Sequence, residues 1–173
     1  KILVTGNIKF DSALQAYYKA ISRASSHYYR SYAEKNPLIW LAGSTQEDEH
    51  IPCLKTFLQL KETLPSLQFI LVPRKPETLA AALQFLQENK KAYTLRSSFK
   101  PGEKIEDLFI IDTIGELFDL YQFASVVFIG KTLTENRGGQ NPLEPAVWSK
   151  AILMGPAYEN FRTITEEMLA ANA

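Results

Sequence analysis

The stretch Gln68-Phe-Ile-Leu-Val-Pro73 decides the fold, because every residue after Gln68 in it is apolar. A strand of a parallel sheet is buried on both faces, so its sequence is a continuous apolar run and not an alternating one. Similar short apolar runs occur at Ile2–Thr5, Leu38–Ala42, Ala92–Leu95, Leu108–Ile111, Val126–Gly130 and Ala151–Met154. We therefore predict a mainly parallel sheet built from these segments.

Longer segments with helical patterns separate the apolar runs. They are Asp11–Lys35, Glu47–Leu64, Glu77–Lys91, Ile114–Ala124, Pro142–Ser149 and Asn160–Ala171. The β-α repetition predicts an α/β fold, Rossmann-like and doubly wound, with helices on both faces of the sheet. Asp11 is expected to cap the first helix, and the pairs Thr45/Asp48 and Thr113/Glu116 have the spacing of weak capping boxes. In such folds ligands bind where the carboxyl ends of the strands meet the loops, at the point where the strand order reverses.

The composition limits the classes of protein. The chain has 173 residues, 46% hydrophobic and 22% charged, which suits one globular domain and is too short for two ordinary ones. Lys plus Arg equals Asp plus Glu at 19 each, so we expect no nucleic-acid partner. No apolar stretch reaches the ~20 residues that span a bilayer, so any membrane association is expected to be peripheral. The start at Lys1, without Met, is interpreted as that of a fragment of a longer protein.

The loop that follows the predicted strand Val126–Gly130 is the richest in the chain. Its glycines, Gly138 and Gly139, permit close approach of the backbone to a ligand. Asn141 is expected to cap a helix whose first residue is Pro142. A glycine-rich turn that leads into a helix N-terminus favours an anion such as phosphate.

Three charged residues of this loop are candidate ligand contacts. Glu144 could accept hydrogen bonds from ribose hydroxyls, or it could only complement the helix dipole, and the local sequence leaves both interpretations open. Lys131 and Arg137 could neutralise the charge of a nucleotide or could remain solvated. Lys131 is the stronger candidate because it directly follows the strand.

Other strand ends add candidates. The amides of Ser44 and Thr45 could bind a phosphate or a sugar, although an ordinary capped turn explains them as well. Arg74 follows an apolar strand and suits a two-point contact with a phosphate or a carboxylate. Gly115 would let the backbone approach a base, and Ile114 could flank that base.

The sequence gives no sign of metal or nucleophilic chemistry. No cluster of His, Cys and Asp has the spacing of metal ligands, and no Asp-x-Asp signature is present. We therefore expect a metal-independent protein without a cofactor. His27, His50 and the single cysteine, Cys53, are interpreted as structural or solvent-exposed, and no residue stands out as a general base.

Six segments, in order, resemble the Kdo transferases (3-deoxy-D-manno-octulosonic acid transferases). Gly138-Gly-Gln-Asn-Pro-Leu-Glu-Pro-Ala146 is similar to the family's Gly-Gly-His-Asn-Pro-Leu-Glu-Pro-Ala motif, and Val4-Thr-Gly-Asn-Ile-Lys-Phe-Asp11 to its Val-Thr-Gly-Asn-Leu-Lys-Phe-Asp segment. The other four are Ala42–Glu47, Leu71–Glu77, Asp112–Leu117 and Leu153–Pro156. The resemblance covers nearly the whole chain.

The resemblance implies a GT-B architecture, in which two Rossmann-like domains face a cleft. Residues 1–173 would form the C-terminal, donor-binding domain, which holds CMP-Kdo or CMP. The N-terminal domain, absent from this chain, would supply the acceptor site, the general base and the membrane contacts. The implied reaction is inverting transfer of Kdo to a lipid A precursor in lipopolysaccharide biosynthesis, at the cytoplasmic face of the bacterial inner membrane. The fragment alone is expected to be inactive.

The resemblance also implies a set of donor-binding residues. They are Ser44, Thr45, Arg74, Ile114, Gly115, Glu116, Lys131, Gly138, Gly139, Asn141 and Glu144. Gln46, Lys75 and Gln140 stand where the family usually has histidines, which affects any histidine-based step but not nucleotide binding. Two other functions remain open: a UDP-sugar-using GT-B transferase or epimerase, and a non-catalytic nucleotide-binding or scaffold domain.

Overall fold

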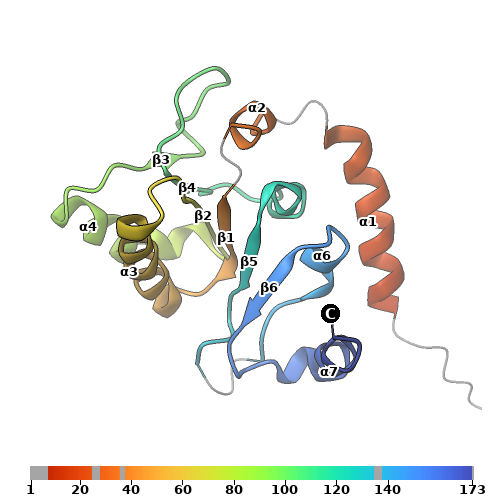
Figure 1. Cartoon of the computed structure of the whole chain (residues 1–173). Coiled ribbons are helices and arrows are strands. Elements are labelled where there is room, and N and C mark those ends of the chain that lie inside the picture. The colour runs from red at the N-terminus through yellow and green to blue at the C-terminus, as the bar shows by residue number, and fades with distance from the viewer. Residues whose placement is uncertain (1–7, 25–27, 36–37, 135–137, 173) are drawn as a thin grey trace, which may run out of the picture.

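A computed structural model describes residues 8–24, 28–35, 38–134 and 138–172. Its centre is one sheet of parallel strands in the order β3-β4-β2-β1-β5-β6 (Figure 1). The strands are β1 (Ile39–Thr45), β2 (Gln68–Pro73), β3 (Thr94–Leu95), β4 (Leu108–Ile110), β5 (Val126–Ile129) and β6 (Ala151–Met154). The predicted parallel α/β fold is thus confirmed, while the predicted strand Ile2–Thr5 lies outside the described residues.

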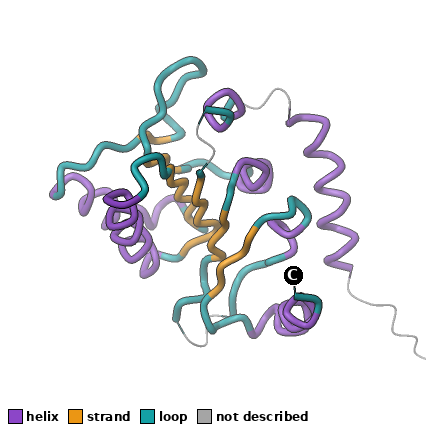
Figure 2. Tube along the Cα trace, viewed as in Figure 1, coloured by secondary structure: helices purple, strands orange, loops and turns teal. Residues whose placement is uncertain are grey.

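Helices cover both faces of the sheet (Figures 1 and 2). Helices α3 (Glu47–Thr63) and α4 (Ala80–Glu88) lie on one face. The other face carries the one-turn helices α2 (Arg30–Ala33), α5 (Leu117–Leu120) and α6 (Leu143–Ala146), with α1 (Ile8–Ala24) outside them. The remaining elements are α7 (Arg162–Ala170) and the 3₁₀ turns η1 (Pro76–Leu79), η2 (Tyr121–Phe123) and η3 (Glu159–Phe161).

Strand β2 contributes side chains to the two hydrophobic cores, one on each face of the sheet. Its residues are all buried, and alternate side chains enter different cores. Phe69 and Leu71 join the core under α3 and α4, whereas Ile70 and Val72 join the core on the other face. A run that is apolar at every position is what such a strand requires, because neither face is open to water.

Several predicted helix boundaries were wrong. The segment Asp11–Lys35 contains two helices, and α1 begins at Ile8, so Asp11 lies in its first turn and is not its cap. The segment Ile114–Ala124 becomes helical only at Leu117, because Gly115 has a φ of +94°, outside the right-handed helical region.

The strand order reverses at β1 and β5. From β1 the chain adds β2, β3 and β4 on one side, and it then returns to place β5 on the other side of β1. The backbones are very close at this point. A Cβ added to Gly130, just after β5, would lie 2.5 Å from the Cα of Thr45 and would also collide with the carbonyl oxygen of Ser44. The carboxyl ends of β1 and β5 therefore meet without space for a side chain.

We predict that Gly130→Ala lowers the free energy of unfolding by about 3 kcal/mol, because the new methyl group overlaps backbone atoms that cannot rotate away. Urea denaturation of the purified chain measures this change. Gly102→Ala is the matched control. Its Cβ meets nothing within 4 Å, so only its positive φ opposes the substitution, at about 1 kcal/mol. Equal losses in the two variants would contradict the close approach at Gly130.

Candidate functional site

The predicted donor-binding residues lie at the carboxyl edge of the sheet. Ser44 and Thr45 end β1, Glu144 lies in α6, and the others lie on the segments that follow β2, β4 and β5. Backbone hydrogen bonds hold neighbouring strand ends together: the N–H of Arg74 donates to the carbonyl of Thr45 at 2.8 Å, and the N–H of Gly130 donates to that of Gly43 at 2.8 Å. The structure therefore gathers the predicted residues along one edge, at the place where doubly wound folds bind ligands.

Glu49, in the first turn of α3, occupies the centre of this edge and is only 2% exposed. Its Oε2 accepts the N–H groups of Gln46 at 2.9 Å and Lys131 at 2.6 Å, and its Oε1 accepts those of Thr132 at 2.9 Å and Leu133 at 3.1 Å. Successive backbone amides of this kind form a concavity that binds anions. Here a carboxylate of the protein itself fills that concavity.

The start of α3 differs from the prediction by one residue. Gln46 is the N-cap and Glu49 holds its N–H, so the Thr45/Asp48 capping box is wrong. The hydroxyl of Thr45 is buried and donates to the carbonyl of Val72 at 3.4 Å. The hydroxyl of Thr45 and the N–H of Gln46 are thus used within the protein, while the predicted ligand contacts of the Ser44 and Thr45 amides stay predictions.

The glycines of the β5–α6 loop have the backbone conformation that requires glycine, with φ of +81° at Gly138 and +72° at Gly139. Their close approach, however, is to the protein itself. A Cβ on Gly138 would lie 2.6 Å from Cγ of Asn160, and one on Gly139 would lie 2.9 Å from the carbonyl oxygen of Ala157. The Cβ side of both glycines thus faces residues 157–160, and their predicted contact with a ligand stays a prediction.

The start of α6 lies one residue later than predicted: the helix begins at Leu143, and Pro142, with a helical backbone (φ −77°, ψ −14°), is in the N-cap position. The predicted partner is nevertheless in place, because Oδ1 of Asn141 accepts the N–H of Leu143 at 3.2 Å. Because α6 is a single turn, its first backbone amides offer more to a ligand than its dipole does.

Glu144 lies half-buried in this turn, with few partners. Nδ2 of Asn141 donates to it at 3.4 Å. Burial raises the pKa of the Glu144 carboxyl above its usual range, and the hydrogen bond from Asn141 and the charge of Arg74 oppose that rise. The structure thus brings Arg74 from β2 and Glu144 from α6 within electrostatic reach of each other. Unlike Glu49, Glu144 retains acceptor capacity for a ligand.

Tyr121 is a buried neighbour of Glu144 that no sequence pattern singles out. Burial raises the pKa of its hydroxyl well above the usual value, and the negative charge of Glu144 adds to the rise. A Cβ on Gly43 would lie 2.9 Å from the Tyr121 hydroxyl oxygen, so glycine at the end of β1 leaves room for the phenol. In the sequence Tyr121 is one aromatic residue in an apolar segment, which is typical of a core position.

The loop after β4 divides into an open part and a paired part. The side chain of Ile114 is 87% exposed, and the space beside Gly115 is open. The Glu116 carboxylate accepts hydrogen bonds from the hydroxyl of Thr113 and from Nε of Arg96, the latter at 2.8 Å. Burial alone would raise the pKa of Glu116, but these bonds outweigh it and lower the pKa. The Thr113/Glu116 pair precedes the helix and is not its capping box.

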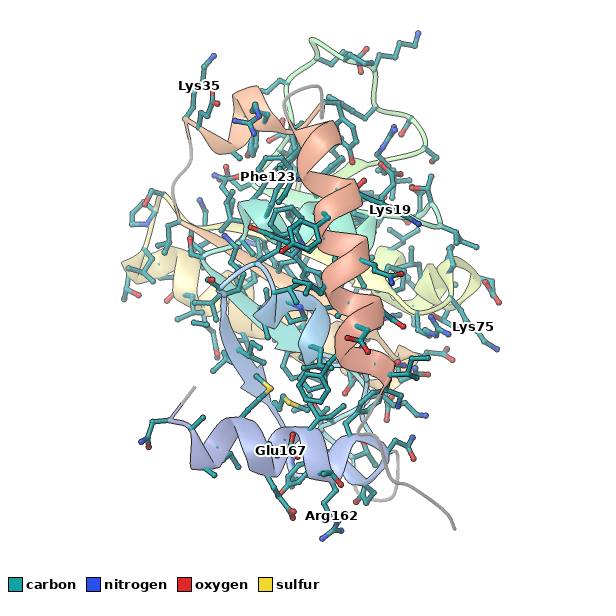
Figure 3. All side chains as sticks on the ribbon, turned by 90° about the vertical axis from the view of Figure 1, so that its right-hand side faces the viewer. Lys19, Lys35, Lys75, Phe123, Arg162 and Glu167 are labelled. Atoms are coloured by element: carbon teal, nitrogen blue, oxygen red, sulfur yellow. The ribbon has the colours of Figure 1, made fainter. Side chains whose placement is uncertain are left out.

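Among the remaining residues that the sequence analysis discussed, Lys131 and Lys75 are accessible to solvent, whereas His50 and Cys53 are buried. Lys131 is half-exposed, with a left-handed backbone at φ +63°, and its N–H is held by Glu49. Lys75 extends away from the body of the molecule (Figure 3). His50 and Cys53 are buried; burial lowers the pKa of the imidazole and raises that of the thiol to about 12. These two are structural, while His27 and Arg137 lie outside the described residues.

Neither a metal site nor a membrane span is found in the part of the chain that the structure describes. No group of three or more His, Cys, Asp or Glu side chains there is placed to hold a metal ion. None of the helices described is both long and apolar enough to cross a bilayer.

Known proteins similar to this chain are mostly transferases, although no family model matches it. The 3-deoxy-D-manno-octulosonic acid transferase of Haemophilus influenzae is 30% identical over 95% of the chain, and that of Bordetella pertussis 32% over 98%. A bifunctional glycosyltransferase/methyltransferase of Fusobacterium nucleatum is 30% identical over 98%. The chain spans only 37%, 39% and 26% of these proteins, respectively.

The fold has a solved counterpart. The C-terminal CMP-Kdo binding domain of WaaA from Acinetobacter baumannii superposes with a TM-score of 0.79 and 29% sequence identity. The match covers 90% of this chain and 80% of that domain. Sequence and fold therefore point to the same group of proteins.

We predict that Glu49→Ala lowers the free energy of unfolding by about 3 kcal/mol, because it leaves buried N–H groups without an acceptor. Guanidinium denaturation checks the value. Glu47→Ala is the control: this exposed carboxylate lies in the same turn, and its loss should cost under about 1 kcal/mol through the helix dipole alone. If Glu49→Ala were as mild as the control, the carboxylate would not organise this edge.

Proposed function

We propose that this chain, which is similar to the Kdo transferases in sequence and to a C-terminal CMP-Kdo binding domain in fold, binds CMP-Kdo as the donor half of a glycosyltransferase. The observation that carries this proposal is the superposition, with a TM-score of 0.79, on a domain described as CMP-Kdo binding. The transferase relatives, at 30–32% identity over nearly the whole chain, support the same conclusion. In this proposal the full-length protein transfers Kdo to a lipid A precursor in lipopolysaccharide biosynthesis.

We propose that the donor lies along the part of the carboxyl edge that Glu49 leaves open. Glu144 has free acceptor capacity and takes the ribose hydroxyls, while the exposed Arg74 takes the phosphate or the Kdo carboxylate. Ile114 and Gly115 offer an exposed apolar side chain and open backbone beside the base. The start of α3 is an unsuitable phosphate site, because its first turn is acidic and its amide at Gln46 is already bonded to Glu49.

The proposed chemistry is inverting transfer in which CMP leaves as the sugar carbon becomes electron-poor. Arg74, with Lys131 near the same edge, stabilises the negative charge of the leaving phosphate. The acceptor hydroxyl must lose a proton, and we assign this step to the N-terminal part of the longer protein, because Glu49 is saturated by amides and Glu116 is paired with Arg96. No step in this scheme uses a metal. We place the full-length protein at the cytoplasmic face of the bacterial inner membrane, bound peripherally.

Calorimetry with CMP, UMP and UDP tests the proposal. CMP should bind the isolated chain weakly, near millimolar or about −4 kcal/mol, because one domain provides one wall of the donor site. UMP and UDP should bind less well. Tighter binding of UDP would instead favour a UDP-sugar transferase or epimerase. Failure of the full-length protein to bind any cytidine nucleotide would overturn the proposal, and binding without Kdo transfer would favour a non-catalytic nucleotide-binding domain.

We predict that Glu144→Ala weakens CMP binding by about 1–3 kcal/mol, the usual effect of losing hydrogen bonds to a charged group. Titration calorimetry measures the change, and Glu159→Ala, at an exposed site on η3, should leave the affinity unaltered. Unchanged affinity in a folded Glu144→Ala protein would remove Glu144 from the donor site.

We predict that Glu144→Gln weakens CMP binding but stabilises the fold. Burial raises the carboxyl pKa, so the folded state binds the proton more tightly than the unfolded state. The stability that the protonated wild-type carboxyl contributes is therefore lost as pH rises from the usual glutamate range through the raised pKa, and the neutral amide avoids this loss. Denaturation at both ends of this range should show the stability gain of Glu144→Gln growing with pH. A gain that did not depend on pH would contradict this origin.

A further inference from the structure

Helix α1 presents an apolar stripe to solvent. Ile8, Phe10, Leu14, Tyr18 and Ile21 are between 42% and 76% exposed. The spacing of the last four, at intervals of four, four and three residues, places them on one side of the helix. Figure 3 shows α1 crossing the outside of the molecule, as the outermost element in that view.

The side of α1 next to this stripe is already buried. Ala13 and Ala20 are in contact with the body of the domain, and the ring of Tyr17 meets that of Trp148 edge-on, with 4.8 Å between centroids. The apolar face of α1 is therefore wider than the part that the described residues cover, and its uncovered part offers area for a second contact.

A groove of about 450 Å³ runs along the exposed side of α1. It is lined by Ile8, Asp11, Ser12, Leu14, Gln15 and Tyr18. Its mixture of apolar walls and uncharged or acidic polar groups suits a folded protein surface. A bilayer with anionic lipids would favour a rim of free cations, whereas Asp11 is acidic and the ammonium of Lys9 lies over the ring of Phe161 at 4.2 Å.

The start of the stripe lies close to the carboxyl edge of the sheet. Lys9 contacts Phe161, and the neighbouring residue Asn160 donates its N–H to the carbonyl of Gly138 at 2.9 Å. A domain that packs against α1 would therefore also border the proposed donor site.

We propose that the exposed stripe of α1 is the docking surface for the N-terminal domain of the longer polypeptide to which this chain corresponds. The inference rests on the proposed function, since it takes the chain as a C-terminal domain. The transferase relatives are more than twice as long as this chain, which spans 37% and 39% of them, and the solved counterpart is the C-terminal domain of its protein.

The test compares the isolated chain with the full-length protein by hydrogen exchange. Amides of residues 8–21 should exchange at least about tenfold more slowly in the full-length protein. Leu14→Glu/Tyr18→Glu should abolish this extra protection while shifting the melting temperature of the isolated chain by no more than about 2 °C. The control is Leu60→Glu, an apolar residue 37% exposed on α3, across the sheet from α1, which should leave the protection intact.

Three results would overturn the proposal. One is equal protection of α1 in the chain and the full-length protein. Another is a dimer of the chain in sedimentation velocity that Leu14→Glu/Tyr18→Glu dissociates, which would make a second copy the occupant. The third is flotation of the chain with phosphatidylglycerol vesicles that the same variant abolishes. Titration of the variant chain with CMP separates this question from the proposed function, because neither position lies at the donor edge.

Discussion

The carboxylate of Glu49 is the contact on which the rest of the site depends. The parallel strands β1 and β5 both end at the reversal point, and four backbone N–H groups there would have no acceptor without Glu49. Glu49 thereby holds the left-handed turn at Lys131 and the two residues that follow it. The residue after β6 is held against the same turn. The N–H of Gly155 donates to Oγ1 of Thr132 at 2.9 Å, and a Cβ at Gly155 would lie 2.6 Å from the Thr132 carbonyl carbon.

Two glutamates, each in the first turn of a helix after a strand, have opposite roles. Glu49 receives short bonds to both carboxylate oxygens, so its acceptor sites are used and it has become part of the scaffold. Glu144 accepts one long hydrogen bond, from Asn141, and its pKa is raised by burial in spite of the charge of Arg74. A half-buried carboxylate with unused acceptors costs stability, and such groups are characteristic of binding sites. The scaffold carboxylate makes the site rigid, and the second remains available for a ligand.

The sequence predicts the sheet because burial on both faces constrains every residue of a strand, as in β2. The sequence also locates the carboxyl edge of the sheet, where the candidate site lies, because the predicted strands show where each strand ends. It could not reveal that Glu49 bonds to Lys131, because the two are 82 residues apart and no local pattern encodes the contact. The same limit explains the misplaced cap at Thr45, whose hydroxyl turned to β2, and the glycines at 138 and 139, which make room for residues 157–160.

The open side of the site and the exposed stripe of α1 have a common physical explanation. Arg74 is exposed, and in water a charge attracts a phosphate only weakly. Stabilising a leaving phosphate requires fixed charges in a site from which water is excluded. The proposed transfer would therefore need a second domain above the carboxyl edge, held by something other than the ligand. The stripe of α1 offers apolar area for that purpose, and it starts beside Phe161 and the loop that carries Gly138. Docking there would bring the covering body next to Arg74 and Glu144 before the donor arrives.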